Sequence, residues 1–361
     1  MTPFHGSYRP EQVTFLLKPI ELAPITDTAA KEALIQSGQK HYSEMLSPEY
    51  PPSDAYLALF RDACAQNDAR LAADCLRLAA LIAAKHRAPP ALVSLARAGT
   101  PVGVILRDIL ARHYRAPVAH YSISIIRDRG IDQNALRHIL ARHAAESLVF
   151  IDGWTGKGVI ARELDRAIAA YNRAHGTAID PGLYVLADLS GTAACATSSD
   201  DYLIPTALLN ATISGLISRS ILNEQIGADD YHGCVYYDHL RAHDQSQTYA
   251  DRIAALCPLP LPAATAADTR AAAATSAALL AQLREHYRIS DDNLIKPGIG
   301  ETTRVLLRRQ PERLLLRDPN AAATRHLVRL AQEKHVAIEH APELPYHAVG
   351  IIRSHRPGAT P

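Results

Sequence analysis

The feature that most constrains the fold is a regular alternation of short apolar runs and longer helical segments between residues 54 and 190. The apolar runs are short enough to be buried strands, and they span residues 91–95, 118–126, 148–151 and 183–187. The other segments have apolar residues three and four positions apart, as helices do, and they span residues 55–85, 102–113, 133–144 and 159–175. Strands that alternate with helices predict a parallel sheet covered by helices on both faces. We therefore expect a doubly wound, Rossmann-like α/β fold.

The chain has 361 residues, which is two to three times the usual size of one domain. Residues 257–262 alternate proline with other residues, and residues 263–281 are rich in alanine and threonine, which is typical of a linker that leads into a helix. Residues 294–334 then carry nine lysines and arginines against four acids. We expect a first domain at 1–257, a linker and helix at 258–284, and a small basic α/β domain at 285–361.

Composition excludes several classes of protein. The net charge is only +1, so no global field attracts nucleic acid or an anionic membrane. The five cysteines include no Cys-x-x-Cys pair, which argues against a disulfide framework and against a structural zinc site. No apolar run has the length of a signal peptide or a membrane span, so we expect a cytoplasmic protein with no membrane partner.

Ligands bind at the carboxyl ends of the strands in such sheets, and the loop after residues 148–151 has the residues for an anion site. Its sequence is Asp152-Gly-Trp-Thr-Gly-Lys-Gly158. Its glycines let backbone amides approach an anion, and the helix that follows adds a positive dipole. The predicted phosphate-binding residues are Thr155, Gly156, Lys157 and Gly158. This is not a Walker A loop, because glycine follows the lysine where serine or threonine is required.

A second anion site is predicted in the loop after residues 91–95. The guanidinium of Arg97 offers two parallel N–H donors to an anion, and Gly99 allows the anion to approach the backbone closely. Asp152 can accept hydrogen bonds from sugar hydroxyls. Together the two loops predict a ligand with a phosphate at one end, a polyol in the middle and a second phosphate group at the other end.

The two loops resemble the ligand-binding motifs of a known enzyme family. Leu148-Val-Phe-Ile-Asp-Gly-Trp-Thr-Gly-Lys-Gly158 resembles the phosphoribosyl-pyrophosphate motif of type I phosphoribosyltransferases, and Val93-Ser-Leu-Ala-Arg-Ala-Gly-Thr-Pro101 resembles their pyrophosphate loop. Three further segments, at 43–48, 201–205 and 214–219, are similar to the phosphoribosyltransferase family of bacterial tellurite-resistance and stress gene clusters. Members of that family have also been labelled StiP-like cysteine proteases.

The resemblance implies that a nitrogenous base replaces pyrophosphate on phosphoribosyl pyrophosphate, or the reverse, with Mg²⁺ as cofactor. The implied catalytic residues are Arg97, Asp152, Arg127 and Arg129, with the metal held at Asp152 through the ligand. The implied pyrophosphate-binding residues are Arg97, Ala98, Gly99 and Thr100, with a strained Arg97-Ala98 peptide in either the cis or the trans form. Asp188, Asp201, Ser214 and Arg219 would form the wall around a nucleobase-like acceptor. A homo-oligomer is also expected.

The segment Lys296-Pro-Gly-Ile-Gly-Glu-Thr-Thr-Arg304 resembles the RNA-contacting turn of the pelota and kink-turn-binding ribosomal family. The resemblance implies that the C-terminal domain binds RNA, because phosphate contact needs only charge and position. The implied RNA-binding residues are Lys296, Gly300, Glu301, Arg304, Arg308 and Arg309. In the alternative interpretation, this segment binds nothing or packs on the first domain.

Two other functions remain open from the sequence. A non-catalytic protein could use the sugar-phosphate pocket to sense a nucleotide while the basic domain holds RNA. The spacer between Asp152 and the Thr-Gly pair is shorter than is usual in the phosphoribosyl-pyrophosphate motif, which favours this hypothesis. A cysteine protease would need a thiolate beside an imidazole. Cys195 and Cys234 lie in glycine-containing segments, and the nearby histidines are His232, His239 and His243.

Overall fold

The large part of the molecule is built around an eight-stranded, mostly parallel sheet. The computed structural model describes residues 4–354. The main strands run in the order β1-β4-β3-β6-β8-β7 and are β1 (Thr14–Leu16), β3 (Ala91–Ala96), β4 (Ala119–Ile126), β6 (Leu148–Ile151), β7 (Trp154–Thr155) and β8 (Leu183–Asp188). At its sides, β5 (Gly130–Ile131) pairs antiparallel with β4, and β9 (Cys195–Ser198) pairs parallel with β8. A separate short pair joins β2 (Lys18–Pro19) to β10 (Gly233–Cys234).

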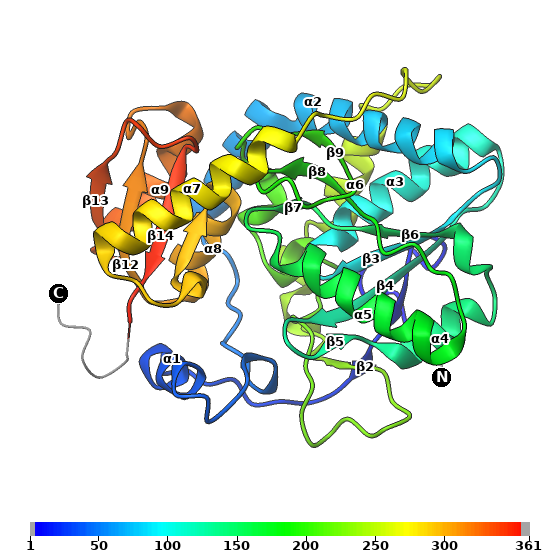
Figure 1. Cartoon of the computed structure of the whole chain (residues 1–361), viewed down its shortest axis with the longest axis horizontal. Helices are drawn as coiled ribbons and strands as arrows, with labels where there is room; N and C mark the ends of the chain where they lie inside the picture. Colours follow the sequence, from blue (N-terminus) through cyan, green and yellow to red (C-terminus); the bar gives the residue numbers. More distant parts are fainter. Residues whose placement is uncertain (1–3, 355–361) are drawn as a thin grey trace.

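Helices cover both faces of this sheet (Figure 1). One face packs against α2 (Asp54–Lys85), α3 (Gly99–Tyr114) and α6 (Ser246–Ala255), and the other packs against α4 (Gln133–Leu140) and α5 (Val159–His175). Each face has its own buried apolar cluster, as expected for a sheet whose strands are apolar on both sides. The predicted α/β class with a mostly parallel central sheet is therefore confirmed.

The C-terminal part is a smaller α/β unit around a four-stranded sheet, reached through the long helix α7 (Arg270–Tyr287) (Figure 1). Its strands run in the order β11-β14-β12-β13 and are β11 (Ile295–Pro297), β12 (Pro311–Leu316), β13 (Ala337–His340) and β14 (Ala348–Ile352). The neighbouring strands β12 and β13 pair in parallel, and β14 pairs antiparallel with both β11 and β12. The remaining helices of the unit are α8 (Ile299–Arg308) and α9 (Arg325–Glu333).

Asp201 helps to hold the C-terminal part against the large sheet. One oxygen of its carboxylate accepts a hydrogen bond from the backbone amide of Ile299 at the start of α8, and the other accepts from the amide of His347, both at 2.8 Å. Nearby, the Tyr346 hydroxyl donates to the backbone oxygen of Leu189 at 2.7 Å. Burial raises the pKa of Asp201 to about 6. These contacts fix the beginning of α8 beside the carboxyl end of β8.

The short helix α1 (Thr28–Gln36) lies apart from both sheets (Figure 1). Glu32 is fully buried and forms a two-pronged ion pair with Arg309, in which the Arg309 Nη2 to Glu32 Oε2 distance is 2.7 Å. Lys31 is also buried and donates to the Ser47 hydroxyl. This helix therefore forms a polar bridge between the N-terminal segment and the C-terminal unit.

The periodicity of the sequence located most of the central elements, but it missed several strands. The predicted strands at 91–95, 118–126, 148–151 and 183–187 correspond to β3, β4, β6 and β8 within one residue at each end. The strands β1, β7, β9, β11 and β14 were not predicted; the first four have only three, two, four and three residues. No helix in the described part of the chain is long and apolar enough to cross a membrane.

We expect Asp201→Ala to lower the free energy of unfolding by about 2–4 kcal/mol, because it leaves two backbone amides without their acceptor. Chemical denaturation monitored by circular dichroism measures this loss. Asp200→Ala is the matched control, because that side chain is exposed and pairs with Arg70 at the surface. Equal stability of the two variants would contradict the role assigned to Asp201.

Candidate functional site

The loop from Thr155 to Gly158 forms a tight turn into the amino end of α5, as the sequence predicts for an anion cradle. The Thr155 hydroxyl accepts a hydrogen bond from the amide of Gly158 at 2.9 Å. Gly158 has a φ of 71°, a left-handed conformation that favours glycine, and it is the N-cap of α5. The Lys157 ammonium donates to the backbone oxygen of Asp292 in the C-terminal part. The loop therefore touches both parts of the chain.

The predicted pyrophosphate loop lies beside this turn, but its side chains are already engaged. The guanidinium of Arg97 donates to Glu49 at 2.6 Å and to the backbone oxygen of Ile217 at 2.8 Å. The side chains of Arg97 and Glu49 are only 9% and 11% exposed. Thr100 is fully buried, and its hydroxyl bonds to that of Ser122. An anion at Arg97 would therefore have to displace Glu49.

Backbone contacts place the two loops next to each other. A β-carbon added to Gly99 would lie 2.5 Å from the backbone oxygen of Ile151 and 3.1 Å from the α-carbon of Asp152, so this close approach requires glycine. Ala98 is the N-cap of α3, which begins at Gly99. The cis peptide of this loop is Ala96–Arg97, one residue earlier than the expected Arg97–Ala98 bond.

A cavity of about 400 Å³, here called the first cavity, separates the Thr155 loop from the C-terminal part. A second cavity of about 450 Å³ adjoins it on the side of Arg97. The two cavities share six lining residues, namely Lys31, Arg219, Lys296, Glu301, Arg304 and Arg309. The predicted phosphate loop and pyrophosphate loop thus open onto neighbouring spaces, each closed by the C-terminal part.

Of the residues predicted to bind RNA, all except Gly300 line one or both of these cavities. The Arg304 guanidinium stacks over the ring of Trp154 at 4.2 Å. Gly300 lies against the same ring, because an added β-carbon would be 2.7 Å from it. Arg308 donates to the side chain of Asn210, and Arg309 pairs with Glu32. The basic turn therefore faces the large part of the molecule.

The positive charges in the first cavity are crowded and poorly hydrated. Burial, reinforced by the neighbouring charge of Lys296, lowers the pKa of Lys157 to about 7. Burial likewise lowers the pKa of Lys296. Burial also lowers the pKa of Lys31 to about 8, with Arg219 adding to the effect. The pKa values of three lysines that line the same cavity are all lowered. This indicates an excess of positive charge, which a bound anion would neutralise.

Two carboxylates face this group of cations. Burial raises the pKa of Asp152 to about 6, although the Gly153 amide donates to its carboxylate at 2.8 Å. Burial acts in the same direction on Glu301, but Arg304, Lys296 and Lys157 outweigh it and lower the pKa of Glu301. Glu301 therefore stays ionised among the cations, and Asp152 is more readily protonated.

The structure places several other predicted site residues in supporting positions. Asp188 is buried and accepts hydrogen bonds from the amides of Ser190 and Ala193, so it stabilises the conformation of the loop that follows β8. Asp201 docks the C-terminal part, as described above. Ser214 is buried at the end of a short 3-10 turn. Arg129 pairs with Glu44 and lines neither cavity. These four residues therefore do not form a wall around a bound acceptor or pyrophosphate.

Arg127 and Arg219 do line the cavities. Arg127 donates to the side chain of Asn293 at 2.8 Å, which links the large part to the C-terminal part. Arg219 donates to the backbone oxygens of Tyr42 and Met45, and both arginines lie over the Tyr42 ring at 5.3 Å. Sequence reasoning missed Lys31, Tyr42 and Glu49, because nothing in their local pattern indicates that they meet at this site.

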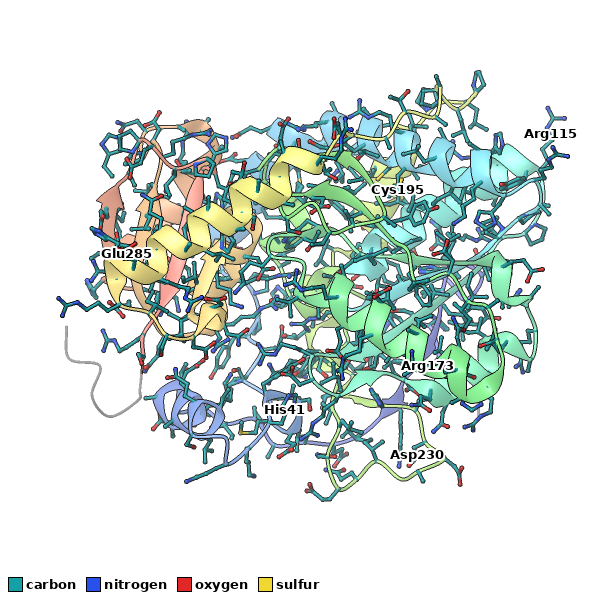
Figure 2. All side chains as sticks on the ribbon, viewed as in Figure 1. His41, Arg115, Arg173, Cys195, Asp230 and Glu285 are labelled. Carbon is teal, nitrogen blue, oxygen red and sulfur yellow. The ribbon has the colours of Figure 1, made fainter. Side chains whose placement is uncertain are left out.

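The cysteines are poorly prepared for nucleophilic chemistry. Four of the five are buried, and Cys195, at the start of β9, is partly exposed (Figure 2). Burial raises the pKa of Cys195 to about 11 and that of Cys234 to about 12. Among residues 4–354, no cysteine sulfur hydrogen-bonds a histidine. The ring of His232 bonds instead to the Ser124 hydroxyl at 2.7 Å.

The described residues contain no group of three or more histidine, cysteine or acidic side chains suited to a metal ion. The expected Mg²⁺ site therefore has Asp152 as its single named protein contact. It stays a prediction, and no step below depends on it.

Comparison with known proteins identifies the family. Residues 6–254 match the family described as tellurite-like stress resistance cysteine protease StiP. Residues 274–354 match the PELOTA RNA binding domain. A protein of Acinetobacter baylyi (strain ATCC 33305 / BD413 / ADP1), named cysteine protease StiP, is 44% identical over 365 residues, covering 97% of this chain and 94% of that protein. The chain belongs to the StiP family of tellurite-like stress resistance proteins and carries a C-terminal PELOTA RNA binding domain.

These comparisons contradict the predicted phosphoribosyltransferase activity. The family and the relative carry the name of a cysteine protease, and nothing in the comparisons supports a transferase or phosphoribosyl pyrophosphate and a nucleobase as partners. The prediction relied on strand-end loops rich in glycine and cations. Such loops specify affinity for anions, whereas a reaction is specified by the whole site. The expected stress family and pelota-like domain are confirmed.

We expect Cys195 to react with iodoacetamide at pH 7.5 on the order of a hundred times more slowly than a free thiol, because its thiolate is rare at that pH. The rate should rise steadily as the pH approaches 11. Mass spectrometry of the peptide that contains Cys195 measures it, and the unfolded chain serves as the control. Fast alkylation at neutral pH would contradict this assignment and would reveal an activated thiol.

Proposed function

We propose that the working site of this stress-resistance protein is the first cavity, and that the site binds a phosphorylated ligand. The observation that carries the proposal is the apposition of Lys157 from the large part and Lys296 from the C-terminal part across the cavity. Burial lowers the pKa of both lysines, and the charge of Lys296 lowers that of Lys157 further, so the charged forms cost free energy unless an anion lies beside them.

Three features of the cavity suit phosphate in particular. Backbone amides at the amino end of α5 and the Thr155 hydroxyl lie on one side, where a helix dipole favours negative charge. The guanidinium of Arg304 lies on the other side, held flat by Trp154. Lys157 connects the two sides. The resulting site collects donors of three chemical kinds around one space, as phosphate-binding sites do.

A second proposed ligand of this chain is RNA. The match to a PELOTA RNA binding domain supports RNA as a partner of residues 274–354. The basic residues expected to contact RNA line the same cavities as the phosphate loop. A phosphorylated ligand and RNA therefore draw on the same positive charge.

Sulfate provides a direct test, because its charge is constant between pH 6 and pH 9. We expect Lys157→Met to weaken sulfate binding about tenfold at pH 6, the scale of one charged hydrogen bond. Lys157 is protonated mainly below pH 7, so the affinity of the native chain should fall as the pH rises from 6 to 9. Isothermal titration calorimetry of the full chain measures both effects.

The matched control for this test is Lys40→Met, because Lys40 is exposed and lines neither cavity. It should leave the affinity and its pH profile unchanged. A native chain that binds no sulfate at pH 6, or one that binds it equally well with methionine at position 157, would overturn the proposed function.

Cysteine peptidase activity is a second candidate, favoured by the names of the family and of the relative. Cys195 is the candidate nucleophile, because among the described cysteines it alone is not buried. It lies on β9 beside Tyr184 of β8 and lines neither cavity. Peptide hydrolysis at Cys195 would therefore occur at a place separate from the phosphate site.

If this chain is a peptidase, we expect Cys195→Ser to abolish the hydrolysis of a quenched fluorescent casein, because an alcohol there lacks the nucleophilicity of a thiolate. Activity should rise with pH above 8, in line with the raised pKa of the thiol. Cys257→Ser, at a buried cysteine, is the control. Hydrolysis that survives in the Cys195→Ser variant would reject this nucleophile.

A further inference from the structure

We propose that RNA binds this protein as a single-stranded end, which enters the junction between the two parts and places a terminal phosphate at the Thr155–Gly158 loop. The strand would then continue through the second cavity and leave past Tyr50. This inference rests on the proposed function, because it names the phosphorylated group that the first cavity receives.

The first argument is the direction in which the RNA-binding residues face. Lys296, Arg304 and Arg309 line both cavities, and Arg308 lines the second. Arg304 and Gly300 pack on Trp154, which belongs to the phosphate loop of the large part. RNA that uses these residues must therefore enter the junction. An RNA-binding turn on an open face would make contact without involving the large part.

The second argument is size. The cavities measure about 400 and 450 Å³, at the lower end of the range of small-molecule sites. Each is large enough for about one nucleotide, and a double helix is too wide to enter. Because the cavities share part of their walls, together they can hold two successive nucleotides of a single strand. Single strands and ends are also the forms of RNA whose bases are free for contact.

The third argument is charge. Ten lysines and arginines line one or both cavities, against four acids. The cations are Lys31, Arg97, Arg127, Lys157, Arg219, Lys296, Arg304, Arg308, Arg309 and Lys334, and the acids are Glu49, Asp152, Asp291 and Glu301. This excess exceeds what one phosphate neutralises. A strand with several phosphates matches it along its whole length.

The fourth argument is the presence of donors that lack acceptors. The Nε atoms of Arg304 and Arg308 are buried and have no hydrogen-bond partner in the described structure. The indole nitrogen of Trp154 is also buried and has no hydrogen-bond partner in the described structure. Buried donors are normally satisfied, so three around one junction indicate a missing acceptor, and phosphate oxygens provide several.

Tyr50 lies where the RNA strand would leave the second cavity. Its side chain lines the second cavity and is 74% exposed, the most exposed large apolar side chain of the described residues. Bases of single-stranded RNA stack on aromatic rings of this kind. A strand whose terminal phosphate lies at Lys157 would pass Arg304 and Arg308 before its next base reaches Tyr50.

The test is fluorescence anisotropy of the full chain with six-nucleotide RNAs that end in a 5′-phosphate, a 3′-phosphate or hydroxyl groups only. We expect one phosphorylated end to bind about tenfold more tightly than the hydroxyl-ended strand. Lys157→Met should remove that preference, because it should weaken the binding of the phosphorylated strand more than that of the hydroxyl-ended strand. Arg308→Met should weaken all three strands, and a blunt RNA duplex should not bind.

Arg325→Met is the matched control, because Arg325 is exposed in the same C-terminal part and lines neither cavity. Circular dichroism melts show whether each variant is folded. Three results would overturn the inference: equal binding of phosphorylated and hydroxyl ends, duplex binding as tight as single-strand binding, or adenosine monophosphate binding as tight as the phosphorylated strand. Sulfate binding that depends on Lys157, found together with any of these, would leave the proposed function intact.

Discussion

The arrangement of Lys157 and Lys296 on opposite sides of one cavity is the interaction around which the functional part of this molecule is organised. Burial lowers the pKa of both lysines, and repulsion from like charges adds to the effect: Lys296 acts on Lys157, and Arg309 and Arg127 act on Lys296. Glu301 lies among these cations and offsets part of the repulsion. The remaining positive charge opposes close docking of the two parts.

Other contacts must therefore hold the C-terminal part in place. Asp201 accepts two backbone amides from it, and Tyr346 reaches back to the backbone of the loop after β8. The ring of Trp154 packs against Gly300, and Glu32 on α1 neutralises the charge of Arg309 through an ion pair. Trp154 and Arg309 themselves line the first cavity, whereas Asp201 and Tyr346 lie outside its lining. The docking is thus stable while the centre stays positively charged, which is the arrangement that a binding site for an anion requires.

The features that could be predicted from the sequence are those encoded by residues close together in the chain. The turn from Thr155 to Gly158 follows from glycines and a helix start within a few residues, so its shape could be predicted. The engagement of Arg97 by Glu49 joins segments 48 residues apart, and that of Asp201 by Ile299 joins segments 98 apart. No local pattern encodes such pairs. The sequence therefore located the loops but assigned to Asp201 and Arg97 roles that tertiary contacts exclude or obstruct.

The positions of the cysteines bear on what the family name means for this chain. A peptidase needs a thiolate that is both exposed and stabilised, and burial works against the thiolate at each cysteine whose pKa it raises. Cys195 has Lys85 as a nearby cation, but its pKa remains above that of a free thiol. The cations that could stabilise a thiolate are concentrated at the junction, which none of the five cysteines lines in the described structure. Peptidase chemistry at Cys195 would therefore have to draw its activation from a conformational change or a partner at β9.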